Sequence, residues 1–153
     1  MGLFSFIKTA GEKIFGAGAD TPEEKKEEVG SMQLLNHIKA LNLGSEGVKV
    51  SLKGDQVILN GEVESQEVAE KVILAVGNVE GVGSVQSNLT VKKKAPEAKY
   101  HTVEKGEWLS KIAKEYYGDA NKYTVIFEAN KPMLKDPDKI YPGQVLRIPP
   151  LEQ

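Results

Sequence analysis

The 153-residue chain contains no cysteine, and this absence excludes several kinds of chemistry. Disulfide frameworks, thiol nucleophiles and zinc-thiolate sites all require cysteine, so none of them can operate here. A chain without cysteine also fits a reducing compartment. The only two histidines, His37 and His101, fall within an expected helix and strand, and no serine lies in a nucleophile-elbow motif. We therefore predict that the protein is not an enzyme and has no catalytic residues.

An excess of basic residues is also missing. Lys and Arg number 20 against 22 Asp and Glu, which gives a formal net charge of −2. Nucleic-acid-binding proteins concentrate basic residues on one face, whereas the densest basic run here is only Lys92, Lys93 and Lys94. We therefore expect no nucleic-acid partner. The remaining composition, 40% hydrophobic and 27% charged, is that of an ordinary globular protein.

Long apolar runs are absent as well, because no segment approaches the roughly 20 consecutive apolar residues of a membrane-spanning helix. Near the N-terminus, seven apolar residues recur at helical spacing and predict a short amphipathic helix: Leu3, Phe4, Phe6, Ile7, Ala10, Ile14 and Phe15. Lys8, Glu12 and Lys13 interrupt this run, which argues against a secretory signal. We expect a cytoplasmic protein with no integral membrane association. We favour an arrangement in which the predicted helix packs on the body of the protein. The alternative is that it lies on a membrane surface.

Hydrophobic periodicity then divides the chain into two units. The first predicts a helix ending at Leu41, a β-hairpin over residues 48–63 that turns at Gly54 and Asp55, a helix from Ser65 to Gly77, and a last strand over residues 82–91. Residues 92–99 lack apolar periodicity and include Pro96, so they predict a linker. The second unit, residues 100–149, predicts the order strand, helix, helix, strand.

The predicted fold class is therefore α+β. Residues 1–20 would form an N-terminal amphipathic helix packed on a first domain, residues 21–91, in which two helices cover a three-stranded sheet in the order αββαβ. The linker, residues 92–99, would lead to a βααβ domain, residues 100–149.

The second unit carries a turn at Lys105 and Gly106, Asn130 at the end of its second helix, and the closing motif Ile-Tyr-Pro-Gly-Gln at residues 140–144. In this order the motifs resemble the LysM family, whose members fold as βααβ and often bind N-acetylglucosamine polymers. By position, the resemblance implies a saccharide groove made by Gly106, Glu107, Trp108, Leu109, Lys139 and Ile140. Glu107 stands where LysM modules commonly have Asp, and Trp108 where they commonly have Thr or Ser. We therefore expect weak saccharide binding or none.

Residues 31–91 resemble a BON domain through Val-Ile-Leu-Asn-Gly-Glu-Val-Glu-Ser at residues 57–65 and Val-Glu-Gly-Val-Gly-Ser-Val at residues 79–85. A Met-Gly-Leu-Phe start, one BON domain and one LysM domain in so short a chain are similar to a family of bacterial cytoplasmic potassium-binding proteins. The resemblance implies that K⁺ is the ligand. By aligned position it places backbone-carbonyl ligands on Ile7, Ala10, Gly77, Val79 and Val82. We also expect a monomer whose LysM domain offers a surface to a further protein partner.

The chemistry of potassium fits such a site. Selective protein sites replace the hydration shell of K⁺ with several neutral carbonyl oxygens, whereas carboxylate cages suit smaller divalent ions. Helix C-termini leave their last carbonyls unpaired, and the chain has two such places, one around Ile7, Ala10 and Gly11 and one at residues 76–82. If both contribute ligands, binding of K⁺ would order the N-terminal segment against the BON domain.

Other interpretations stay open from the sequence. Gly77 could be a helix cap with a left-handed backbone, and Val79 and Val82 could be core residues. The chain could also be a cell-envelope protein that binds peptidoglycan through LysM and phospholipid through BON. A third interpretation is a protein adaptor with no ion specificity.

Overall fold

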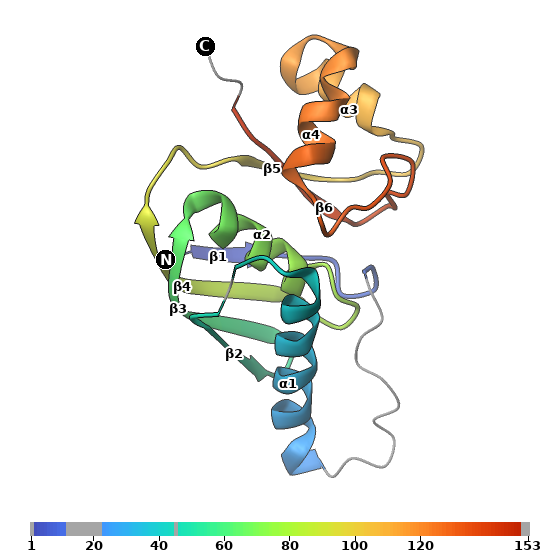
Figure 1. Cartoon of the computed structure of the whole chain (residues 1–153). Helices are drawn as coiled ribbons and strands as arrows, with labels where there is room; N and C mark the ends of the chain where they lie inside the picture. The colour runs from blue at the N-terminus through green and yellow to red at the C-terminus, as the bar shows by residue number, and fades with distance from the viewer. Residues whose placement is uncertain (1, 12–22, 45, 151–153) are drawn as a thin grey trace.

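The computed structural model of the chain describes residues 2–11, 23–44 and 46–150 (Figure 1). The first domain consists of β1 (Gly2–Ser5), α1 (Glu23–Leu41), β2 (Val48–Lys53), β3 (Gln56–Ser65), α2 (Gln66–Gly77) and β4 (Ser84–Lys93). The second consists of β5 (Lys99–Thr102), α3 (Leu109–Tyr117), the short 3-10 helix η2 (Ala120–Lys122), α4 (Tyr123–Ala129) and β6 (Val145–Ile148). The structure thus confirms the α+β class and the predicted αββαβ and βααβ orders.

The sheet of the first domain has the strand order β1-β4-β3-β2. β2 and β3 form the predicted antiparallel hairpin, and Gly54 adopts a φ of 62° in its turn. β3 pairs in parallel with β4, and α2 is the crossover between them. Figure 1 shows α1 and α2 covering the same face of the sheet. Alternate residues of β3, Val57, Leu59 and Val63, are buried and supply the apolar face on which the helices pack.

The predicted N-terminal helix is wrong for residues 2–11, which contain no helix. Residues 2–5 form β1, which pairs antiparallel with β4 from Gly2 opposite Ser87 to Ser5 opposite Ser84, and residues 8–11 form turns and bends. A short apolar run fits a strand as well as a helix, and here burial follows the two-residue period: Leu3 is 65% exposed and Phe6 is 8% exposed. The edge of β4 offers backbone partners, so a strand forms and the sheet has four strands instead of three. Ile14 and Phe15 lie outside the described residues.

α1 is a single helix that continues through Gly30 and buries Leu34 and Ile38. Its polar side chains accept hydrogen bonds from the neighbouring hairpin. Ser31 Oγ accepts from the Leu52 N–H at 2.8 Å, and Glu27 Oε2 accepts from the Gly54 N–H at 2.7 Å. The helix is therefore attached to the hairpin of β2, one of the two edge strands of the sheet, by specific polar contacts as well as by its apolar side.

The second domain has its own core beneath a two-stranded sheet of β5 and β6. Leu109, Ile112, Ile126 and Leu146 are buried in this core. Asn130, at the end of α4, accepts a hydrogen bond from the Arg147 N–H at 2.8 Å and donates one to the Arg147 carbonyl at 3.0 Å. This pair of bonds ties the second helical segment to β6 and explains why an asparagine occupies that point of the motif.

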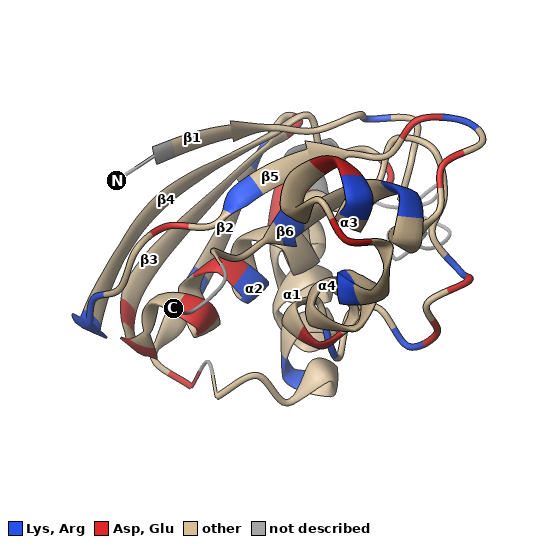
Figure 2. Ribbon diagram, turned by 90° about the horizontal axis from the view of Figure 1, so that it is seen from above, with Lys and Arg blue, Asp and Glu red and all other residues tan. Residues whose placement is uncertain are grey.

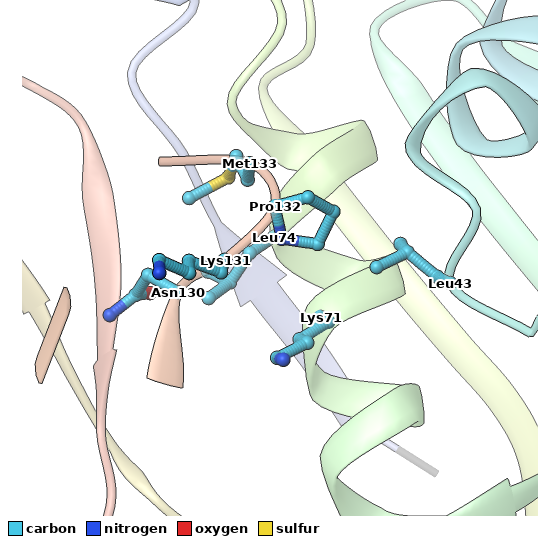
Figure 3. A pocket seen from close by; sticks show the side chains of 7 residues that line it. All are labelled: Leu43, Lys71, Leu74, Asn130, Lys131, Pro132 and Met133. Carbon is cyan, nitrogen blue, oxygen red and sulfur yellow. The ribbon is translucent and has the colours of Figure 1, made fainter. Parts of the chain in front are cut away.

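α2 of the first domain lies against the second domain. Arg147 in β6 reaches Glu70 in α2, with Nε and Nη2 at 3.0 Å and 2.6 Å from Glu70 Oε1. The linker joins this contact because the Ala98 N–H donates to Glu70 Oε2 at 3.0 Å. Figure 3 shows a small pocket nearby, lined from the first domain by Leu43, Lys71 and Leu74 and from the second by residues 130–133.

Charges elsewhere on the molecule are mixed. Figure 2 shows acidic and basic residues interspersed over the ribbon of both domains. Exposed pairs such as Lys8 with Asp55, at 3.2 Å, are typical of this surface. Among the Lys and Arg ion pairs of the described residues, only Glu70–Arg147 is buried. The side chains of Glu70 and Arg147 are 2% and 8% exposed.

Glu70→Ala tests this contact between the domains. We expect the free energy of unfolding to fall by about 3–5 kcal/mol, because the Arg147 guanidinium would be left buried without its partner. The matched control is Glu67→Ala on the same helix, which removes a partly exposed pair with Lys71 and should cost at most about 1 kcal/mol. Urea unfolding of both variants provides the comparison, and equal losses would contradict the assigned role of Glu70.

Candidate functional site

The candidate site begins at the C-terminal end of α2. Residues 77–83, called here the α2–β4 turn, connect this helix to β4. The Asn78 N–H donates to the Leu74 carbonyl at 2.9 Å and closes the helix, and the Val82 N–H donates to the Val79 carbonyl at 3.0 Å. Val79 and Val82 are fully buried. The turn is therefore a compact backbone structure held by apolar side chains, and the interpretation of these valines as core residues is correct for their side chains.

Residues 6–11, called here the N-terminal segment, lie directly against this turn. The Phe6 N–H donates to the Gly83 carbonyl at 3.0 Å, and the Gly81 N–H donates to the Lys8 carbonyl at 2.7 Å. Gly11, with a φ of 116°, approaches the next part of the turn so closely that a Cβ there would lie 2.6 Å from the carbonyl carbon and oxygen of Asn78. Backbone contacts thus join two segments that are far apart in the sequence.

Gly77 is required for a reason that differs from the predicted one. It is the last residue of α2, the residue that caps the helix is Asn78, and Gly77 has no positive φ. The prediction of a left-handed cap at Gly77 is therefore wrong. A Cβ at Gly77 would lie 2.1–2.3 Å from atoms of the Phe6 ring. The glycine is needed for the close approach of this ring, while Gly81, with a φ of 103°, supplies the unusual backbone angle.

All five predicted ligand positions lie in the two segments that the structure brings together: Ile7 and Ala10 in the N-terminal segment, and Gly77, Val79 and Val82 in the α2–β4 turn. The carbonyls of Ile7 and Val79 accept turn hydrogen bonds, from Ala10 and Val82 respectively. Within the described part of the chain, no backbone hydrogen bond of the loops ends on the carbonyls of Ala10, Gly77 or Val82. A carbonyl with one hydrogen bond keeps a second lone pair.

The electrostatic surroundings of the turn are those of a helix C-terminus. α2 has no basic residue in its last turn, so no side chain of that turn offsets the negative end of the helix dipole. The nearby Lys8 ammonium is paired with Asp55. Among residues 2–11, 23–44 and 46–150, no group of three His, Asp or Glu side chains is placed to hold a metal ion.

Sequence reasoning missed two residues that shape this site. Phe6 was assigned only to an apolar helix face, yet it is the ring that covers Gly77. Asn78 was not singled out, although it is 3% exposed and makes side-chain hydrogen bonds to the second domain. A polar residue directly after a helix-ending glycine, followed by the valines at positions 79 and 82, is the sequence signal that could have identified Asn78.

The side chains at the predicted LysM groove positions differ in whether they point inward or are exposed. Glu107 points inward, where its Oε1 accepts hydrogen bonds from His101 Nε2 and from the Glu104 N–H, each at 2.8 Å. Burial opposes ionisation, but these two hydrogen bonds hold the pKa of the Glu107 carboxyl below its ordinary value. His101 Nδ1 lies 3.0 Å from the Tyr116 hydroxyl, so both ring nitrogens of this histidine have a hydrogen-bonding partner.

The other groove positions offer little polar surface. Leu109 is buried in the core, and Ile140 packs partly against it. Gly106 adopts a φ of 87°, and Lys139 is exposed with its N–H bonded to the Asp136 carbonyl. Trp108 is 57% exposed, with the Lys111 ammonium 5.7 Å from its ring centroid. Of the six, Trp108 and Lys139 are the exposed side chains that a ligand could contact.

Comparison with known proteins agrees with this architecture. Residues 32–93 match the BON domain family and residues 101–149 match the LysM domain family. Over 150 residues the chain is 43% identical to the potassium binding protein Kbp of Escherichia coli O6:H1, and this match covers 97% of the chain and 99% of that protein. The chain belongs to the Kbp family. The Kbp-family match includes the N-terminal segment, the α2–β4 turn and the second domain.

Two other relatives share less of their length with this Kbp-family chain. An uncharacterized protein of Deinococcus radiodurans is 39% identical over 120 residues, covering 70% of the chain and 46% of that protein. An endolysin of Bacillus phage B103 is 32% identical over 121 residues, covering 77% of the chain and 42% of the endolysin.

The contact between Gly77 and Phe6 is testable by a double-mutant cycle. Gly77→Ala should lower the free energy of unfolding by about 1–3 kcal/mol through overpacking against the ring, although alanine is otherwise favoured over glycine in a helix. In a Phe6→Leu background the same substitution should cost clearly less, because the ring is gone. Equal costs in both backgrounds, measured by urea unfolding, would show that the ring does not impose the glycine.

The inward position of Glu107 predicts that the LysM domain binds chitin oligomers or muropeptides weakly or not at all. Trp108 is the only tryptophan, so a fluorescence titration reports directly on the groove. We expect no saturable change. Saturable binding that calorimetry finds abolished in Trp108→Ala would contradict this expectation and favour a wall-binding function.

Proposed function

We propose that this chain is a cytoplasmic potassium-binding and potassium-sensing protein, and not an enzyme. In this proposal K⁺ is held between the N-terminal segment and the α2–β4 turn. The ligands are the backbone carbonyls of Ile7, Ala10, Gly77, Val79 and Val82.

The observation that carries the proposal is the direct backbone contact between the two segments. The hydrogen bond from Gly81 to the Lys8 carbonyl and the approach of Gly11 to Asn78 place peptide groups of both segments next to one another. A large monovalent cation is best held by several neutral carbonyl oxygens. In the proposed site, the α2–β4 turn and the N-terminal segment supply them. The end of the α2 dipole adds negative potential at the same place.

The same geometry gives a mechanism for sensing. Carbonyl dipoles that converge without a cation repel one another, so the N-terminal segment is held less firmly when the ion is absent. K⁺ binds only the arrangement in which both segments contribute, and it therefore shifts the ensemble toward the compact state. Because the ligands are backbone atoms, the response depends on the path of the chain and little on side-chain charge.

The family relationship supports this assignment, since the Escherichia coli relative that matches almost the whole chain carries the name potassium binding protein. Within the described residues, no helix has the length and apolar character needed to cross a membrane. We propose that the protein acts as a monomer and that the LysM domain presents a surface to a further protein.

The direct test is isothermal titration with K⁺, Na⁺ and Ca²⁺. We expect saturable binding of K⁺ and much weaker binding of the other two. A K⁺ concentration of 100 times Kd should raise the free energy of unfolding by about 2.7 kcal/mol, and the same concentration of Na⁺ should not. Equal effects of Ca²⁺ and K⁺, or no K⁺ effect, would exclude the proposed function.

A pair of neighbouring substitutions separates backbone ligands from side-chain ligands. Glu80 is exposed in the α2–β4 turn, and Glu80→Gln should change K⁺ affinity by no more than about fivefold. Gly81→Val forces a β-branched residue into the left-handed region and changes the path of the turn, so it should abolish measurable binding. Hydrogen exchange should show K⁺-dependent protection of residues 7–11 and 77–82 in the wild type and its loss in Gly81→Val.

A further inference from the structure

The second domain contacts both segments of the proposed site. We infer that Asn78 and Gly143 are positioning residues through which the LysM domain sets the geometry of the carbonyl ligands. This inference rests on the proposed potassium function and adds that the affinity and ion selectivity of the site depend on a domain that contributes none of the proposed ligands.

Asn78 joins the α2–β4 turn to β6. Its Oδ1 accepts a hydrogen bond from the Val145 N–H, and its Nδ2 donates to the Val145 carbonyl, both at 2.8 Å. The side-chain amide therefore pairs with one residue of β6 as a neighbouring strand would. Asn78 is 3% exposed, and its own backbone N–H closes α2 on Leu74. Both the backbone and the side chain of this residue are thus fixed.

The backbone of Asn78 also lies between two proposed ligands, Gly77 and Val79. Gly11 lies close to the Asn78 carbonyl and to the N–H group of Val79. A Cβ on Gly11 would lie 2.6 Å from the Asn78 carbonyl and 2.8 Å from the Val79 nitrogen. The peptide group is therefore packed against the N-terminal segment while the side chain holds the second domain. A rotation of Asn78 would reorient the adjacent carbonyls, and the bonds to Val145 oppose that rotation.

Gly143 contacts the N-terminal segment itself. With a φ of 90°, it sits so close that a Cβ would lie 2.7 Å from the Cβ of Ala10 and 3.5 Å from the Cβ of Ile7. The Gly143 N–H donates to the Val103 carbonyl at 2.8 Å, so this loop is fixed within the second domain. Ile7 and Ala10 are the two proposed ligands of the N-terminal segment, and the LysM domain packs against both.

The matched pair Gly143→Ala and Gly106→Ala tests this inference. Both glycines lie in the LysM domain with nearly equal φ values of 90° and 87°, so alanine brings the same backbone strain to each. A Cβ at Gly106 meets nothing within 4 Å, whereas one at Gly143 meets Ala10. By calorimetry, Gly143→Ala should raise the Kd for K⁺ by about tenfold or more, and Gly106→Ala by no more than about twofold. Equal Kd values for the two variants would overturn the inference.

Asn78→Ala provides an independent test with a readout that loss of stability alone does not change. If the variant only reduced the folded fraction, the affinities for K⁺ and Rb⁺ would fall by the same factor. Displaced carbonyls instead change the ratio of the two affinities. We expect the Kd for K⁺ to rise by about tenfold to a hundredfold, because two hydrogen bonds are lost and both backbone groups of Val145 are left unpaired. We also expect the ratio of the K⁺ affinity to the Rb⁺ affinity to change.

The failures of the two proposals are distinguishable. A wild-type protein that does not bind K⁺ would exclude the proposed function. A wild-type protein that binds K⁺, with Asn78→Ala and Gly143→Ala retaining its affinity and its K⁺ to Rb⁺ ratio, would overturn the positioning role alone.

Discussion

The arrangement of this molecule depends on the packing of the peptide group between Asn78 and Val79. One side of this group contacts Gly11 of the N-terminal segment, while the Asn78 side chain holds Val145 of β6. Three parts of the chain that are separated in the sequence are therefore in contact here: the turn itself, the N-terminal segment and β6. Because each contact involves backbone atoms, the tolerance for displacement is small, and a change in any one part is transmitted to the other two. This constraint makes the turn suitable for a response to a bound ion.

α2 is the element through which the two domains become one packed structure. Its middle carries Glu70, paired with Arg147, and its end carries Asn78, paired with Val145, so two buried polar contacts fix the register of β6 on the helix. The apolar core of the first domain also includes residues of the second domain, namely Val145, Met133 and Tyr100. Buried polar pairs add little net stability when compared with apolar packing, but they penalise any other register because unpaired partners are costly.

The sequence predicts local structure well where periodicity is strong and fails where distant segments decide the outcome. The hairpin, both helices of the first domain and the βααβ order follow from two-residue and helical periods. β1 does not, because its short apolar run fits either period until the edge of β4 is available. Gly77 was identified as special for the wrong reason, since the Phe6 ring that requires it is remote in the chain. The role of Asn78 depends on Val145, which is 67 residues away in the chain. The inward orientation of the Glu107 side chain depends on its contact with His101.

In the proposed site, backbone carbonyls of the N-terminal segment and the α2–β4 turn hold the ion. The most direct measurement is anomalous diffraction from crystals grown in Rb⁺, which resembles K⁺ in charge and hydration and can be located by its own scattering. We expect an anomalous peak between residues 6–11 and 77–83, in contact with the carbonyl oxygens of Ile7, Ala10, Gly77, Val79 and Val82. A strong peak coordinated by carboxylates elsewhere, with none between these two segments, would contradict it.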